Sequence, residues 1–268
     1  MLITFDLDGV LMENPFSKGV FPEIKEILYK QYNKQIISKN KNKSEEEIKS
    51  LIWQNILAEY KKYSAKNFYK AYDWDMIVKN VIDKLNLKVN IDVAFLVEKY
   101  CHNPYIKRYT DGVNLLKKLN NQNYKLKVVT NGYYKYQYPV LNNLELSPYF
   151  SEIVTCDKAE SAKPEKEIFL KALEKYNSKN WIHIGDSVLM DVYGTNKLKG
   201  NSVLIDRNLP EDIASIEIKQ RVKRDITKEY ILKTGKKEKQ FNNINFEENE
   251  IYPDYIVNTL DDIMKILC

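Results

Sequence analysis

Helical spacing of apolar residues dominates one block of the chain, from about residue 17 to residue 104. Apolar positions such as Ile24 and Leu28 recur there at the spacing of amphipathic helices. Ser44-Glu45-Glu46-Glu47 has the pattern of a capping box, so we expect a helix to begin there after a polar break at 39–43. The pattern predicts a small, separate, all-helical domain.

Short apolar runs on both sides of this block predict strands, and helical patterns separate them. Strands that alternate with helices indicate an α/β fold with a doubly wound, mostly parallel, Rossmann-like sheet. We therefore assign 1–16 and 105–268 to a core domain and 17–104 to an inserted helical domain. The expected strands lie at about 2–7, 126–130, 153–155, 181–185, 202–206 and 255–257.

The segment 207–250 departs from this alternation because it is long and highly charged. Apolar positions between Ile213 and Tyr230 predict some amphipathic helix, whereas 233–250 has the composition of a flexible, solvated loop. Lysine and arginine cluster at 220–224, but charge runs are usually solvated faces, so we expect no nucleic-acid polymer as a partner.

Composition fits an ordinary soluble protein. The 268 residues are 44% hydrophobic and 29% charged, and the net charge of +5 is compatible with a small anionic substrate. Cys101, Cys156 and Cys268 have neither a disulfide pattern nor metal-ligand spacing. We find no signal peptide and no membrane-length apolar segment, so we expect a cytoplasmic protein that does not bind membranes.

Polar side chains stand at the ends of the expected strands. Asp6 and Asp8 share one side of the first strand, and Gly9 lets the chain turn away. Two such carboxylates suit a divalent cation, an acid/base pair or a nucleophile with its proton donor, whereas the alternative is a solvated turn. Ligands of doubly wound sheets bind beyond the carboxyl ends of the strands. The residues expected at that edge are Asp6, Asp8, Thr130, Asn131 and Asp186.

Four stretches, in order, resemble the motifs of the haloacid dehalogenase-like (HAD) phosphohydrolase superfamily. The helical block resembles the cap of subclass I members, and the run from Thr130 to Phe169 resembles the branch that holds phosphoglycolate phosphatases and nucleotidases. The four stretches are Phe5-Asp6-Leu7-Asp8-Gly9-Val10, Val128-Val129-Thr130-Asn131-Gly132, Lys163-Pro164 at a helix start, and Gly185-Asp186-Ser187 with Asp191.

The resemblance implies a role for each motif residue. Asp6 would attack phosphorus to give an aspartyl-phosphate, and Asp8 would be the general acid and base. Thr130, the Asn131 backbone N–H and Lys163 would hold the phosphoryl group. Asp6, Asp186 and the backbone carbonyl of Asp8 would bind Mg²⁺. Asp191 would steady metal-bound water from the second coordination shell.

Each of these residues also has a purely structural interpretation. Thr130 could be a strand-end hydroxyl, Lys163 a surface lysine at a helix start, and Asp191 a helix cap. His183, inside a strand, is interpreted as a packed core histidine rather than a catalyst. The tyrosines after the second motif, Tyr133, Tyr134 and Tyr136, could pack in the core, contact the cap or stack on substrate.

The sequence predicts a Mg²⁺-dependent phosphomonoesterase that acts on a small phosphorylated metabolite. Asp8 argues against a dehalogenase, because that reaction needs no acid two residues after the nucleophile. A phosphomutase of the β-phosphoglucomutase kind and a non-catalytic binding module are the alternatives. Nucleoside monophosphates, phosphoglycolate and sugar phosphates all stay open as substrates, with a slight preference for nucleotides. The protein could be a monomer or a homodimer, and 207–250 could be a flap, a lid or a dimer arm.

Overall fold

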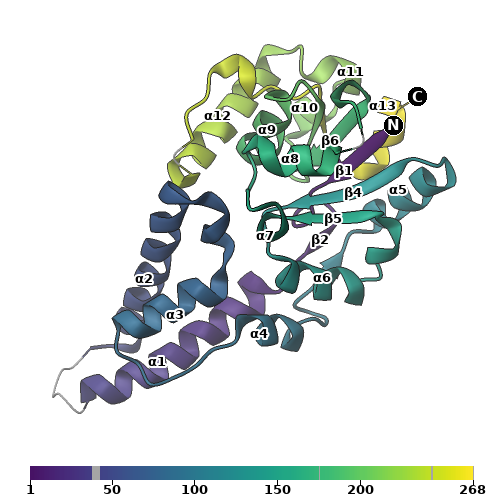
Figure 1. Cartoon of the computed structure of the whole chain (residues 1–268). Coiled ribbons are helices and arrows are strands. Elements are labelled where there is room, and N and C mark those ends of the chain that lie inside the picture. The colour runs from purple at the N-terminus through teal and green to yellow at the C-terminus, as the bar shows by residue number, and fades with distance from the viewer. Residues whose placement is uncertain (38–42, 175, 243, 268) are drawn as a thin grey trace. The chain divides into compact units, whose positions relative to one another are not determined.

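The computed structural model describes residues 1–37, 43–174, 176–242 and 244–267. Most of the polar break expected at 39–43 lies outside the described residues. The chain divides into two compact units, and each is made of separate segments (Figure 1). One unit comprises Met1–Glu13, Lys107–Tyr134 and Leu144–Cys268, and the other comprises Asn14–Ile106 and Lys135–Asn143.

A parallel β-sheet forms the centre of the first unit. Among the described residues its strand order is β5-β4-β1-β6-β7-β8, and every neighbouring pair is parallel. This arrangement confirms the predicted doubly wound α/β fold. The strands are β1 (Leu2–Phe5), β4 (Lys125–Thr130), β5 (Glu152–Thr155), β6 (Trp181–Gly185), β7 (Asn201–Ile205) and β8 (Tyr255–Val257).

Strand β1 lies inside the sheet and is buried along its whole length. Its last residue, Phe5, is in register with Val128 of β4 and Ile184 of β6. A strand that is covered on both faces needs a continuous apolar run, and the first residues of the chain supply one. The register also brings the ends of β4, β1 and β6 to one edge of the sheet, where the polar motifs begin.

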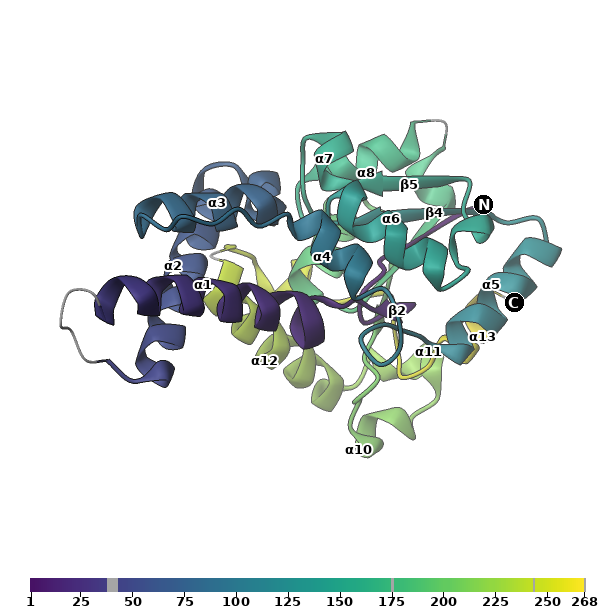
Figure 2. The ribbon, with the colours of Figure 1, turned by 90° about the horizontal axis from the view of Figure 1, so that it is seen from below.

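Helices cover both faces of this sheet (Figures 1 and 2). On one face, α8 (Lys166–Leu173) contacts β4, β5 and α9 (Tyr193–Asn196). On the other, α5 (Thr110–Asn121) contacts the turn η7 (Leu260–Asp262), which leads into α13 (Ile263–Leu267). The strand order runs from β1 through β4 to β5 and then resumes on the other side of β1 with β6, and crossovers of one hand put helices on opposite faces on the two sides of such a reversal.

The second unit is helical and has an aromatic core. The ring of Trp74 lies 4.8 Å from that of Phe21 and stacks on Tyr60 at 6.0 Å. Ser44 and Glu47 form the predicted capping box at the start of α2. The elements are η1 (Phe16–Val20), α1 (Phe21–Ile37), α2 (Glu45–Lys66), η2 (Phe68–Tyr72), α3 (Trp74–Lys84), α4 (Val93–Lys99) and α6 (Tyr134–Asn143).

Helix α6 belongs mostly to the helical unit, although it follows the second motif directly in sequence. The buried Tyr136 donates its hydroxyl proton to Asp75 Oδ2 at 2.9 Å and accepts the Asp75 N–H at 3.0 Å. Burial, followed by the charge of Asp75, raises the pKa of Tyr136 far above its ordinary value. The assignment of the two units as cap and core domains with the boundaries given above stays a prediction.

The segment after β7 is more ordered than its composition predicts. It forms α10 (Glu211–Ala214), α11 (Ile218–Arg221), α12 (Asp225–Asn242) and η6 (Glu248–Glu250). The prediction of a solvated loop from 233 onward is wrong as far as Asn242, because α12 continues to that residue. Its buried Ile231 and its Gly235 anchor the helix, and Gly235 lies against Val188 and Ile251.

Short elements complete the chain. Strands β2 (Met12–Glu13) and β3 (Lys107–Arg108) pair antiparallel where the chain leaves the sheet unit and returns to it. None of the helices among the described residues has both the length and the apolar character that a membrane span requires. The other short elements are η3 (Ser147–Tyr149), α7 (Cys156–Ala159), η4 (Ser178–Asn180) and η5 (Val188–Val192).

Candidate active site

The turn after β1 carries the first two carboxylates. The Asp6 N–H donates to the Ile184 carbonyl at 2.9 Å, which extends the pairing of β1 with β6 by one residue. The chain then turns at Gly9, whose φ of +77° favours glycine. A Cβ on residue 9 would lie 2.1 Å from Asp186 Oδ2, so the turn also makes room for the Asp186 carboxylate.

Three carboxylates converge beside this turn. Asp6, Asp186 and Asp191 each offer an oxygen, and these oxygens lie within 4.8 Å of one another. Crowding by protein atoms, and then the charges of Asp6 and Asp191, raise the pKa of Asp186 well above its ordinary value, although its side chain still reaches solvent. Burial also raises the pKa of Asp6, and Lys163 opposes that shift. The cluster concentrates negative charge that an additional cation would stabilise.

Lys163 lies between two members of this cluster. Its Nζ is 2.9 Å from Asp6 Oδ1 and 2.6 Å from Asp191 Oδ1, and its side chain is only 2% exposed. Burial alone would lower the pKa of Lys163, but the charges of Asp191 and Asp6 outweigh it and raise the pKa. The ammonium group is therefore held in its charged form. The interpretation of Lys163 as a surface lysine is wrong.

Asn131 fixes the backbone of Lys163. The Asn131 Oδ1 accepts the Lys163 N–H at 2.6 Å, and the Asn131 Nδ2 donates to the Lys163 carbonyl at 3.0 Å. Two hydrogen bonds from one planar amide, to the N–H and the carbonyl of one residue, fix the backbone on both sides of the Lys163 Cα. The Asn131 side chain thus joins the second and third motifs. From the sequence we assign a role to the backbone N–H of Asn131 and none to this side chain.

Asp8 and Thr130 occupy the same edge in different ways. Asp8 is exposed, and its charge adds to those that raise the pKa of Asp186, after the larger contributions of crowding and Asp6. Thr130 is buried at the end of β4, and its Oγ1 accepts the Gly132 N–H at 3.3 Å. An exposed acid can reach a leaving group and solvent, whereas the threonine hydroxyl shapes the turn of its own motif.

A chain of buried hydrogen bonds through His183 and Thr4 supports Asp191. His183 Nε2 lies 2.9 Å from Asp191 Oδ1, and His183 Nδ1 lies 2.8 Å from Thr4 Oγ1. Because a carboxylate only accepts, Nε2 carries a proton toward Asp191, while the Thr4 hydroxyl that contacts Nδ1 also accepts the Trp181 indole N–H at 2.8 Å. Burial would raise the pKa of Asp191, but Lys163 and His183 lower it well below its ordinary value. His183 is buried as predicted, and it also orients Asp191.

Arg207 braces the Gly9 turn from the end of β7. Its guanidinium donates to the carbonyls of Gly9 and Val10 at 3.1 and 2.7 Å and forms an ion pair with Asp111 at 2.9 Å. Burial opposes ionisation of Asp111, but Arg207 lowers the pKa of that carboxyl. Sequence reasoning missed Arg207 because two of its partners are backbone carbonyls, which carry no sequence signal, and its third, Asp111, lies 96 residues away in the chain.

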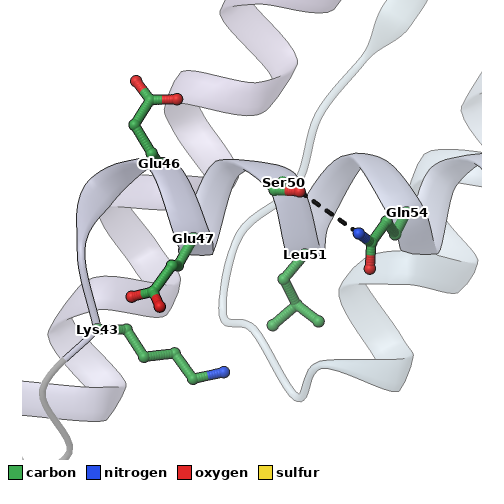
Figure 3. Close-up of a pocket in the computed structure, with 6 residues that line it drawn as sticks. All are labelled: Lys43, Glu46, Glu47, Ser50, Leu51 and Gln54. Carbon is green, nitrogen blue, oxygen red and sulfur yellow. Dashed lines mark hydrogen bonds between the residues drawn. The ribbon is translucent and has the colours of Figure 1, made fainter.

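A surface hollow in the helical unit contains none of these residues. It lies along the first turns of α2 and is lined by Lys43, Glu46, Glu47, Ser50, Leu51 and Gln54 (Figure 3). The dashed line in Figure 3 marks a hydrogen bond of 3.4 Å that Gln54 donates to Ser50, four residues earlier in the helix. The residues around the hollow form a solvated helix face.

Family comparison identifies the class of protein that this fold and site define. The haloacid dehalogenase-like hydrolase family matches residues 3–205, and the chain belongs to this family. The match ends with β7, so the brace residue Arg207 and helix α12 lie beyond it. The predicted superfamily and the prediction of a hydrolase are both confirmed.

Individual relatives sharpen the comparison. The chain is 26% identical to a glyceraldehyde 3-phosphate phosphatase of Methanocaldococcus jannaschii over 267 residues, which cover 99% of this chain and 96% of the relative. It is 29% identical over 150 residues to a protein of the same name from Pyrococcus furiosus, across 54% of this chain and 60% of that relative.

Solved structures share the fold. A HAD phosphatase from Thermococcus onnurineus has a TM-score of 0.67 and 23% identity, with 99% of this chain and 97% of that one covered. A HAD-hydrolase structure from Bacillus subtilis that is bound to magnesium has a TM-score of 0.56 and 15% identity, with the same coverage. The L-2-haloacid dehalogenase of Xanthobacter autotrophicus also scores 0.56 at 15% identity, across 100% and 98% of the two chains.

Proposed function

We propose that the protein is a Mg²⁺-dependent phosphomonoesterase that works through an aspartyl-phosphate on Asp6. The observation that carries the proposal is the position of Lys163, which is buried and charged between Asp6 and Asp191 beside Asp186. This arrangement keeps Asp6 next to a fixed cation, as attack on an anionic phosphate ester requires. Family membership and phosphatase relatives support the same reaction class.

The residues at the edge of the sheet suit Mg²⁺. This ion prefers oxygen ligands and usually takes one or two carboxylates, with water and phosphate in its other positions. Asp6 and Asp186 supply such carboxylates within one small cluster, and the backbone carbonyl of Asp8 is the third proposed ligand. Burial first, and then neighbouring carboxylates, raise the pKa of Asp6 and of Asp186 although Lys163 opposes the shift, so a further cation beside them is favoured. When bound, the ion would neutralise the phosphoryl oxygens and this excess charge.

The first half of the reaction transfers the phosphoryl group to Asp6. An Asp6 carboxylate oxygen forms a bond to phosphorus while the bond from phosphorus to the ester oxygen breaks. Asp8 donates its proton to the departing oxygen, so that an alcohol leaves rather than an alkoxide. Lys163, Thr130 and the Asn131 N–H hold the phosphoryl oxygens, and Asn131 also keeps the backbone of Lys163 in place.

The second half releases phosphate. Asp8, now a carboxylate, takes a proton from a water molecule as that water attacks the phosphorus of the aspartyl-phosphate. The bond between phosphorus and the Asp6 oxygen breaks, which frees inorganic phosphate and restores the Asp6 carboxylate. The exposed position of Asp8 gives it access to both the leaving alcohol and water.

The substrate we propose first is a short phosphorylated metabolite of the triose phosphate kind. Two relatives are named glyceraldehyde 3-phosphate phosphatases, and one of them covers almost the whole chain. The preference for nucleotides that the sequence suggested stays a prediction without support from these relatives. Phosphoglycolate and sugar phosphates belong in the same comparison.

Phosphate release from a panel of these esters tests the proposal. We expect release that requires Mg²⁺, stops with EDTA and is lost in Asp6→Asn and strongly reduced in Asp8→Asn. Asp261→Asn is the matched control, since this exposed aspartate lies in η7, and it should leave activity unchanged. An active Asp6→Asn enzyme would rule out the nucleophile. Isomerisation of a sugar phosphate without phosphate release would instead indicate the phosphomutase alternative.

A further inference from the structure

Glu238 is a half-buried carboxylate on α12, outside the part of the chain that the family match covers. Its Oε1 accepts the Val188 N–H at 2.9 Å, and its Oε2 accepts the Leu189 N–H at 2.9 Å and the Ser187 hydroxyl at 2.6 Å. These three donors immediately follow Asp186. A residue of the charged segment 207–250 therefore binds the loop that carries Asp186, a proposed metal ligand.

The loop is held from its other side by Asp191. The Ser187 N–H donates to Asp191 Oδ2 at 3.0 Å, while the Ser187 hydroxyl accepts the Met190 N–H at 3.0 Å. The backbone N–H groups of four successive residues, 187–190, thus have fixed acceptors, and two of these N–H groups bind Glu238. Because each bond restrains the backbone next to Asp186, the position of the Asp186 carboxylate depends on both Asp191 and Glu238.

Helix α12 is shaped to bring Glu238 to this position. Ile231, Gly235 and Glu238 are spaced by four and three residues, so they share one face of the helix. A Cβ at Gly235 would lie 3.3 Å from Val188 Cγ1 and 3.2 Å from Ile251 Cδ1. The glycine thus allows a close approach of α12 to η5, and Ile231, which is fully buried, anchors the preceding turn.

We propose that Glu238 is a positioning residue that holds the Asp186 loop in the conformation required for divalent-cation binding. The charged segment 207–250 then supports the site through α12 rather than acting as a flap. The proposal rests on the proposed Mg²⁺-dependent function, because it assigns Asp186 to the metal. Loss of an outer partner of a metal ligand typically weakens metal affinity 10- to 100-fold.

Calorimetric titration of the full-length protein with MgCl₂ alone tests this role without any substrate. We expect Glu238→Ala to weaken Mg²⁺ binding by about tenfold or more. Glu238→Gln should lie between Glu238→Ala and the wild type, because its amide oxygen still accepts one or two of the three bonds. Glu229→Gln, an exposed glutamate on the same helix, is the matched control and should bind like the wild type.

Gly235→Ala provides a second variant that keeps the carboxylate. We expect it to weaken Mg²⁺ binding in the same direction, since the added methyl group would lie only 3.2–3.3 Å from the Ile251 and Val188 side chains and so presses on the start of η5. Circular dichroism confirms folding of each variant before titration. A folded Glu238→Ala protein with wild-type Mg²⁺ affinity would overturn the proposal.

The two proposals fail in different measurements. Wild-type protein that binds Mg²⁺ through a Glu238-dependent site but releases no phosphate from any ester contradicts the phosphatase function and leaves the positioning role supported. Wild-type protein that hydrolyses esters, with a Mg²⁺ requirement that Glu238→Ala does not change, contradicts the positioning role and leaves the phosphatase function supported.

Discussion

At the scale of single residues, the charge of Lys163 is the feature on which the site depends. Its ammonium group is buried with the carboxylates of Asp6 and Asp191, and both are within 2.9 Å. Removing one partner of a buried ion pair costs far more than the net contribution of the pair, because the remaining charge stays uncompensated. Without the Lys163 ammonium group, the carboxylates of Asp6 and Asp191 would both lose their partner cation.

We predict that Lys163→Met lowers the free energy of unfolding at pH 7 by about 3 kcal/mol. The lowered pKa of Asp191 means that its ion-pair contribution exists above the ordinary value of 3.8 and is lost as the pH falls through the lower value in the folded protein. The raised pKa of Lys163 preserves its contribution below 10.5, and that contribution is lost at higher pH as the folded-state value is passed. The cost should therefore be fullest near neutral pH, above the raised pKa of Asp6 and below about pH 10.

Denaturant unfolding at several pH values measures this cost. Lys166→Met is the matched control, because Lys166 is exposed at the start of α8, and the change should stay within about 0.5 kcal/mol. Equal losses in the two variants would show that the buried pairs are not the cause.

Much of the candidate site could be predicted at this scale, since Asp6, Asp186, Asp191 and Lys163 do converge. Motif residues can be predicted because their chemistry requires a particular side chain at a strand end. The supporting contacts could not. His183 in β6 contacts Asp191 in the following element η5, and Arg207 binds backbone carbonyls, so the partner of each depends on the folded arrangement.

At the scale of elements, the strands and most helices followed from periodicity, whereas the part of α12 after residue 232 did not. Its lysines and glutamates resemble a solvated loop, and among the described residues of α12 Ile231 is the only buried apolar side chain, although Thr227 and Gly235 are buried too. Helix formation in such a segment depends on tertiary packing more than on intrinsic propensity. One buried apolar side chain (Ile231), one glycine (Gly235) and one hydrogen-bond acceptor (Glu238) are too few to predict a packed helix from the sequence.

Helix α2 shows the opposite case, a local signal that fixes an element boundary. Ser44 Oγ accepts the Glu47 N–H at 3.2 Å, and Glu47 accepts the Ser44 N–H at 2.8 Å. We predict that Ser44→Ala destabilises the first turns by about 1 kcal/mol, which corresponds to amide hydrogen exchange about fivefold faster there. Mass spectrometry of deuterated peptides measures the effect.

Ser50→Ala is the matched control for this prediction. Ser50 lies inside α2 and accepts only a surface hydrogen bond from Gln54. Alanine favours the helix interior, so the exchange rate should stay the same or fall. Faster exchange in both variants would mean that any loss of a hydroxyl loosens the helix, and the cap would not explain the result.

At the scale of the whole molecule, the path of the chain between its two units is unusual. The chain passes from one unit to the other after Glu13, Ile106, Tyr134 and Asn143. The last two passages bracket Lys135–Asn143, which follows the second motif by only a few residues. The residues of α6 in this segment are held in the helical unit by the bonds between Tyr136 and Asp75.

We predict that Tyr136→Phe loosens α6. The change removes a buried hydroxyl and leaves the Asp75 N–H without this acceptor, which costs about 1–3 kcal/mol. Hydrogen exchange over Lys135–Asn143 and the start of α3 should become about tenfold faster. Tyr138→Phe, on the same helix but 38% exposed, is the control and should change exchange little. Unchanged exchange in Tyr136→Phe would mean that other contacts fix the helix.

The path of α6 has a consequence for how specificity can be exchanged between relatives. A helical unit that was one continuous insertion could be replaced as a single cassette between two cut points. Here a chimera that received residues 14–106 from another family member would keep its own Tyr136 but lose its own Asp75. A chimera that exchanges the helical unit therefore has to transfer 14–106 and 135–143 together, and it needs four junctions in the chain rather than two.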